Sequence, residues 1–137
     1  MAEPIAIVTG GRRGIGRAIV EELARVGFHI AVVDLARDES AEAVKTAVEA
    51  AGRKCVFIAA DVADVATHAS IIGQAQTLPG NLCVLVNNAG VSSMVRGDML
   101  ELSQESFDRA INVNLRASFF LSQRFAKTLL AQPQGDG

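Results

Sequence analysis

The sequence predicts an α/β fold, a doubly wound parallel sheet with helices on both faces. Four short runs are apolar apart from His29, without the polar alternation of a half-exposed strand. A helical pattern follows each of them, and a glycine or polar residue stands directly after each run. Strands that are apolar on both faces belong to parallel sheets covered on both sides. The 137 residues are enough for one domain of this kind.

The first unit joins an apolar strand to a helix through a glycine-rich turn. Residues 5–8 are β-branched and apolar, and they predict a buried strand. Apolar residues then recur at helical spacing from Ile15 to Val26, and Gly27 is the expected stop. Glycines let the turn approach an anion closely, while the free N–H groups of the new helix face it. This unit predicts a phosphate-binding turn.

The next elements repeat the alternation of strand and helix. Strands are expected at 28–33 and 55–60. Between them, Ser40 is the expected N-cap of a helix that ends at Gly52. A weak helix is predicted over 63–78.

The last elements are a fourth strand and a long helix. The strand is predicted at 82–86, and Ser103 is the expected cap of a helix that ends near Ala131. Its apolar stripe, which we expect in the core, comprises Phe107, Ile111, Leu115, Phe119 or Leu121, Phe125 and Leu129.

Polar and glycine residues gather where the strands end. Right-handed crossovers place the first strand centrally and a ligand at the carboxyl ends of the strands. Asp34 follows Gly16 by 18 residues, close to the spacing of about 20 at which an acid accepts hydrogen bonds from a ribose. Its alternative role is a solvated strand-end acid. These residues predict a dinucleotide-binding site at the carboxyl ends of the strands.

Four motifs in this order resemble the short-chain dehydrogenase/reductase family. They are Thr9-Gly10-x-x-x-Gly14-x-Gly16, Asp61-Val62, Asn87-Asn88-Ala89-Gly90 and Val113-Asn114-Leu115. The resemblance runs from about Ile5 to Leu130 and is closest to bacterial 3-ketoacyl-acyl-carrier-protein reductase-like members. It implies a Rossmann-type sheet, here incomplete with about four strands. It also implies an NAD(P)-dependent oxidoreductase that acts on a small carbonyl or alcohol.

The resemblance also implies roles for single residues. The pyrophosphate would lie on Gly10, Gly14 and Gly16, with Arg12, Arg13 and Ile15 lining the turn. Asp61 would bind adenine, Val62 would add a backbone contact, and Asn88, Ala89 and Gly90 would form the nicotinamide wall. Asn87 and Thr9 are expected to be structural. Asn114 would bend its helix and hold a water linked to a catalytic lysine; the alternative is a satisfied core asparagine.

The choice between NAD and NADP rests on charge. Asp34 accepts ribose hydroxyls but repels a 2′-phosphate, whereas Arg13 stands where NADP-preferring relatives often carry a base. A dianionic phosphate beside a carboxylate is costly unless Arg12, Arg13 or Arg37 moves over it. NAD is therefore favoured, with NADP as the alternative.

The sequence contains no tyrosine, the residue that serves the family as proton donor. In the family that Tyr and its Lys follow the helix that ends here near Ala131. We expect residues 1–137 to be the N-terminal, cofactor-binding part of one dinucleotide-binding domain, inactive alone. The alternative is a non-catalytic dinucleotide-binding module or sensor.

Composition narrows the partners. The formal net charge is −2, and no block of like charge indicates nucleic acid or a membrane. The acidic start and short apolar runs indicate a cytoplasmic protein. Cys55 and Cys83 lie in apolar runs and are expected to be buried, without a disulfide. The two histidines have no second ligand at the spacing of a metal site, so a metal site is not expected. By resemblance the outer face of the long helix packs on a second copy, in a dimer or tetramer.

Overall fold

The fold is a four-stranded parallel sheet between two layers of helices, as the sequence predicts. A computed structural model describes residues 2–91 and 97–132. The strands are β1 (Pro4–Thr9), β2 (His29–Asp34), β3 (Cys55–Ala59) and β4 (Asn81–Val86). Their order is β3-β2-β1-β4, and every neighbouring pair is parallel. β1 is therefore central, and the carboxyl ends of all four strands meet at one edge.

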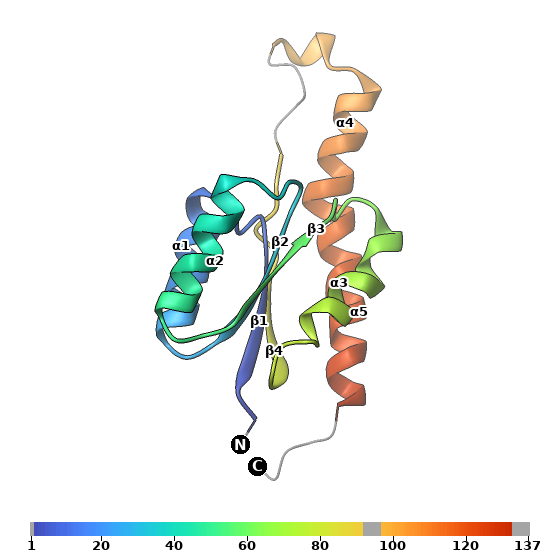
Figure 1. The fold of residues 1–137 in the computed structure, drawn as a ribbon. Helices are drawn as coiled ribbons and strands as arrows, with labels where there is room; N and C mark the ends of the chain where they lie inside the picture. Colours follow the sequence, from blue (N-terminus) through green and yellow to red (C-terminus); the bar gives the residue numbers. More distant parts are fainter. Residues whose placement is uncertain (1, 92–96, 133–137) are drawn as a thin grey trace.

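Helices cover both faces of this sheet (Figure 1). One layer contains α1 (Gly14–Arg25) and α2 (Glu39–Ala50). The other contains α3 (His68–Ala75) and α5 (Ala117–Ala131), while α4 (Gln104–Ile111) continues beyond the carboxyl ends of the strands. Short 3-10 turns, η1 (Val65–Thr67) and η2 (Met99–Glu101), precede α3 and α4.

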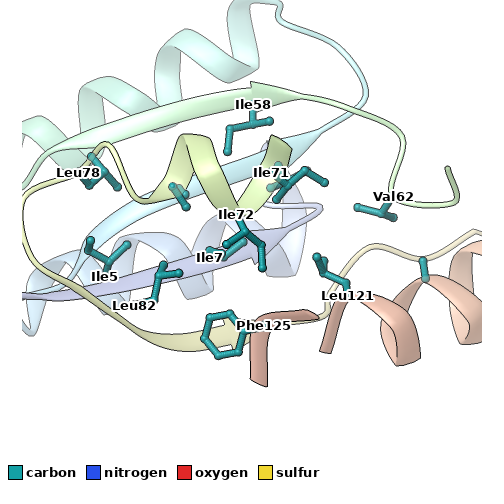
Figure 2. Packing of buried hydrophobic residues seen from close by; sticks show 14 residues of the cluster. Ile5, Ile7, Ile58, Val62, Ile71, Ile72, Leu78, Leu82, Leu121 and Phe125 are labelled. Carbon is teal, nitrogen blue, oxygen red and sulfur yellow. The ribbon is translucent and has the colours of Figure 1, made fainter. Parts of the chain in front are cut away.

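The alternating sides of each strand supply two separate cores. Ile5 and Ile7 of β1 face α3 and α5, and they pack with Leu121 and Phe125 (Figure 2). Ala6 and Val8 belong to the other core, against α1 and α2. Both faces are apolar because both are covered. All of β1 from Ile5 to Val8 has no solvent exposure.

The long predicted helix is interrupted by a π turn, η3 (Asn112–Arg116), between α4 and α5. The expected buried stripe is wrong in its first half: Phe107, Ile111, Leu115 and Phe119 are 55%, 39%, 62% and 61% exposed. The buried positions are Val113, Ala117, Leu121 and Phe125. Both sets recur every four residues, so periodicity alone could not choose between opposite faces.

Three smaller expectations also change. The N-cap of α2 is Asp38, which accepts the Ala41 N–H at 3.1 Å, and not Ser40. The helix predicted over 63–78 is the shorter pair η1 and α3. Cys83 is exposed, because a bulge in β4 leaves it without a Cα partner on β1. Both cysteines are free, and burial raises the pKa of the Cys55 thiol to about 12.

A polar cluster joins the start of the chain to β2, at the edge away from the strands' carboxyl ends. The buried His29 ring accepts the Lys54 N–H at Nδ1, 2.8 Å away, so its Nε2 carries the proton. Nε2 donates to Glu3 Oε2 at 2.5 Å, and Arg53 Nη1 contacts Glu3 Oε1 at 3.1 Å. The His29 hydrogen bond and the charge of Arg53 hold the pKa of Glu3 below its usual value.

This cluster predicts an acid-sensitive contribution to stability. A carboxylate with a lowered pKa stabilises the fold above its unfolded pKa, about 4.3 for Glu, and loses this effect as the pH falls through the folded value. Glu3→Gln should lower the thermal midpoint by about 3 °C at pH 7. The difference from wild type should close as the pH falls below about 4.

The measurement is thermal unfolding followed by circular dichroism from pH 3 to pH 7. Glu49→Gln is the control, because Glu49 is exposed and makes no ion pair within the described part of the chain. A Glu3→Gln difference that stays constant across this pH range would contradict the role assigned to the carboxylate.

Candidate functional site

A cleft of about 250 Å³ opens where the strands end. It lies among the segments that follow β1, β2, β3 and β4, beside α4 and η3. Its lining residues are Gly10, Arg12, Arg13, Val33, Asp34, Leu35, Ala60, Asp61, Val62, Asn88, Ala89, Gly90, Val91, Arg109 and Val113. This is the edge at which ligands of doubly wound sheets bind.

The glycine turn after β1 is pressed against the segment after β4. Gly10 has a φ of +64°, and a Cβ there would lie 3.0 Å from Ala89 Cα. A Cβ on Gly16 would lie 2.1 Å from the Gly10 carbonyl oxygen and 2.5 Å from Asn88 Nδ2. Asn88 Nδ2 itself donates to the Gly10 carbonyl at 3.1 Å. No side chain fits at Gly16 without moving backbone, so glycine there is a packing requirement.

Thr9 and Asn87 hold the site together from below, as the structural role expected for them requires. Thr9 Oγ1 donates to the Val86 carbonyl at 3.3 Å and accepts the N–H groups of Asn88 and Ala89, both at 3.0 Å. Asn87 Nδ2 donates to Ser122 Oγ of α5 at 3.0 Å. The ends of β1 and β4 and the start of α5 are thereby joined side by side.

The two predicted acids lie in the cleft, and both are anchored. Asp34 is 16% exposed and accepts the Leu35 N–H at Oδ1 (2.8 Å) and the Arg12 N–H at Oδ2 (3.2 Å). Asp61 accepts the Ala63 N–H at Oδ1, 3.0 Å away. Each carboxylate oxygen has more than one acceptor position, so both acids can still bind hydroxyl or amino donors.

Arg109 is a site residue that the sequence analysis missed. Its Nη1 lies 2.8 Å from Asp61 Oδ2, and it brings a cation from α4 to the end of β3. The two residues are 48 positions apart, and no spacing rule connects them. The other missed lining residues are Val33, Leu35, Ala60, Val91 and Val113. The first three lie at or near the ends of predicted strands, and this position could have identified them as candidate site residues.

Asn114 lies on the π turn, so the alternative of a buried core asparagine is wrong. The residue is exposed, and its amide clamps the backbone of Val91: Oδ1 accepts the Val91 N–H and Nδ2 donates to the Val91 carbonyl, both at 2.8 Å. The π turn closes with a bond from the Ala117 N–H to the Asn112 carbonyl, five residues back. Asn114 therefore positions the cleft wall from outside.

The structure gathers most predicted site residues in one cleft. Nine line it: Gly10, Arg12, Arg13, Asp34, Asp61, Val62, Asn88, Ala89 and Gly90. Four do not: Gly14, Ile15, Gly16 and Asn114. Ile15 is 76% exposed, because it stands on the outer side of the first turn of α1.

The chemistry of the cleft suits recognition of a polar anion with hydroxyl groups. Three arginines contribute positive charge and two aspartates supply acceptors. Of the described lining residues, none is a His, Cys, Lys or Tyr that could pass a proton. Within the described ranges no three His, Cys, Asp or Glu side chains could hold a metal ion, and no helix is long and apolar enough to span a membrane.

Comparison with known proteins is consistent with this geometry. A profile for the family described as short chain dehydrogenase matches residues 4–136. The L-2,3-butanediol dehydrogenase of Corynebacterium glutamicum is 44% identical over 118 residues, which are 85% of this chain and 45% of that protein.

Two solved structures extend the likeness to three dimensions. The 3-oxoacyl-[acyl-carrier protein] reductase from Brucella melitensis in complex with NAD superposes with a TM-score of 0.90 at 40% identity, covering 99% of this chain and 53% of that one. A short-chain dehydrogenase/reductase from Serratia marcescens gives a TM-score of 0.84 at 44% identity, with coverages of 91% and 50%. The chain thus spans about half the length of the relatives it matches.

The contact at Gly16 predicts a sharp difference between two glycines. Gly16→Ala should lower the free energy of unfolding by about 2–4 kcal/mol, because its Cβ meets a backbone carbonyl that cannot move without opening the turn. Gly73→Ala, on α3, meets nothing within 4 Å and should be neutral or stabilising by up to about 1 kcal/mol. Urea denaturation measures both, and equal effects would refute the packing role of Gly16.

Proposed function

Because the chain belongs to the short-chain dehydrogenase family, we propose that it forms the cofactor-binding part of an NAD(P)-dependent oxidoreductase. The observation that carries the proposal is the convergence of the glycine turn, Asp34, Asp61 and the Asn88 segment on one cleft. The bound nicotinamide would supply hydride transfer to or from a carbonyl or alcohol carbon. A 3-ketoacyl substrate is supported by the likeness to the Brucella melitensis reductase.

The residues present fit a dinucleotide. Glycine at positions 10 and 16 lets the turn pack against the segment after β4. The free N–H groups at the start of α1 would bind the pyrophosphate. Asp34 ends β2, where an acid accepts the hydroxyls of the adenosine ribose. Asp61 would accept the adenine amino group, and Arg109 holds its carboxylate in place. Asn88, Ala89 and Gly90 form the opposite wall.

We propose NAD as the preferred cofactor. The carboxylate of Asp34 is only partly exposed and faces the position of the ribose hydroxyls, where a 2′-phosphate would meet its negative charge. The solved Brucella melitensis relative is a complex with NAD, which agrees with this preference.

The proton donor is the part of the chemistry that these 137 residues do not provide. They contain no Tyr. The resemblance to the family assigns the role of proton donor to a Tyr that follows the helix corresponding to α5. Catalysis therefore belongs to the proposal for the whole protein. The second candidate, a dinucleotide-binding module or sensor, is favoured by the lack of a His, Cys, Lys or Tyr among the described lining residues.

The face of α4 and α5 that the sheet does not cover supports self-association. Phe107, Ile111, Leu115 and Phe119 form a continuous exposed apolar row there. A second copy could bury the same row by twofold symmetry, and we propose a dimer or tetramer. Two free cysteines support a reducing, cytoplasmic location.

Direct binding of cofactor tests the function. The protein should bind NAD, and Asp34→Asn should weaken that binding about tenfold, because a charged acceptor for the ribose hydroxyls is lost. Asp108→Asn, an exposed position outside the cleft, is the matched control and should leave the affinity unchanged. Isothermal titration calorimetry gives both dissociation constants.

Comparing the 137 residues with the whole protein separates the two candidate functions. The 137 residues alone should bind NAD but form no NADH from any alcohol supplied. An oxidoreductase forms NADH in its whole form, whereas a sensor module never does. Failure of the wild-type protein to bind NAD or NADP would refute both candidates.

The apolar row predicts the oligomeric state. Leu115→Glu should convert the proposed oligomer to single chains, because it places a charge at the centre of the contact. Val26→Glu is the control: Val26 is 55% exposed and lies at the end of α1, on the opposite layer. Light scattering after gel filtration reports the masses, and an unchanged mass for Leu115→Glu would count against the interface.

A further inference from the structure

Arg12 is held by two carboxylates from different elements. Its main-chain N–H donates to Asp34 Oδ2 at 3.2 Å, and its side-chain Nε lies 3.7 Å from the same oxygen. At the far end of the side chain, Nη1 donates to Asp38 Oδ2. The Arg12 side chain is only 11% exposed. Arg12 is therefore folded back under the turn, between Asp34 and Asp38.

Asp38 is itself fixed in position. Its Oδ1 caps α2 by accepting the Ala41 N–H at 3.1 Å, which leaves Oδ2 for Arg12. Although desolvation opposes ionisation, the Ala41 hydrogen bond and the Arg12 charge hold the pKa of Asp38 below its usual value. Asp38 is thus a fully charged anchor at neutral pH, attached to the first turn of a helix.

The other arginines near the predicted ribose site differ in their availability. Arg37 donates through Nη2 to the Phe57 carbonyl at 2.7 Å, and its guanidinium lies 5.5 Å from the centre of the Phe57 ring. Arg13 is exposed, and its side chain makes no hydrogen bond, ion pair or ring contact with the described residues. Arg12 is the cation nearest Asp34, and Asp38 decides where its guanidinium points.

We propose that Asp38 is a specificity-determining residue that favours NAD by holding Arg12 away from the 2′-position of the adenosine ribose. The proposal rests on the proposed dinucleotide function. With Asp38 charged, the group of Arg12, Asp34 and Asp38 carries one positive and two negative charges, a net charge of −1. A 2′-phosphate would meet that excess negative charge, and the Nη1 of the guanidinium that could bind it is already bonded to Asp38.

The decisive variant is Asp38→Asn. Asn is as good an N-cap as Asp, so the cap on Ala41 is kept while the charge that holds Arg12 is removed. The local net charge becomes zero and Nη1 is released. We expect the affinity for NADP to rise about tenfold, and the affinity for NAD to change by less than about twofold.

Two further variants make the result specific. Glu39→Gln removes the same charge from the adjacent residue, which does not contact Arg12, and should leave both affinities unchanged. Arg12→Gln combined with Asp38→Asn should lose the gain in NADP affinity, because the phosphate ligand itself is gone. Titration calorimetry with NAD and NADP on the intact protein gives the ratio of the two dissociation constants for each variant, and circular dichroism confirms that each is folded.

The outcomes separate the inference from the function beneath it. A ratio in Asp38→Asn equal to that of wild-type protein overturns the inference, as does an equal change in Glu39→Gln. A gain that survives the loss of Arg12 overturns it too. In all of these cases NAD binding by the wild-type protein leaves the proposed function standing. If the wild-type protein binds neither dinucleotide, the function and the inference fail together.

Discussion

The contact between the end of β1 and the end of β4 is the constraint on which the site depends. Thr9 makes three hydrogen bonds to the last residue of β4 and the segment after it, and the Asn88 amide bonds to the carbonyl of Gly10. Where the two strand ends meet, the Gly10 carbonyl and the Asn88 amide leave room only for glycine at position 16. The floor of the cleft is therefore made of main chain, and it is set before any ligand arrives. Rigid main chain of this kind suits an anion whose phosphates must meet N–H groups.

Around this floor, the charged side chains are held by one another. Asp34 and Asp38 hold Arg12, and Arg109 holds Asp61. Two of these pairs, Arg12–Asp38 and Arg109–Asp61, join the glycine turn or a strand end to α2 or α4. The placement of these two helices therefore sets the charges of the cleft. A ligand entering here would meet charges already oriented, which lowers the free-energy cost of arranging them on binding.

Local patterns were sufficient to predict the sheet, the glycine turn and the strand-end acids. Each depends on residues close together in the sequence, such as the apolar run 5–8 or the turn from Gly10 to Gly16. The pairing of Arg109 with Asp61 could not be predicted from the sequence, because it depends on how far α4 extends past the sheet. The buried side of the helix from α4 to the first turn of α5 was missed for another reason. Rows through Leu115 and through Ala117 are both apolar, and only packing against β1 and β4 decides which one turns inward.

The π turn at Asn112–Arg116 constrains the number of residues in the helical segment from α4 to α5. Each residue rotates an α-helix by about 100°, so a one-residue deletion that restored regular α geometry would turn α4 by that angle relative to α5. Leu121 and Phe125 could then stay in the core only if Arg109 left Asp61. Insertions and deletions should therefore be absent from this segment among related sequences that keep both contacts, whereas the surface loops remain free to vary in length.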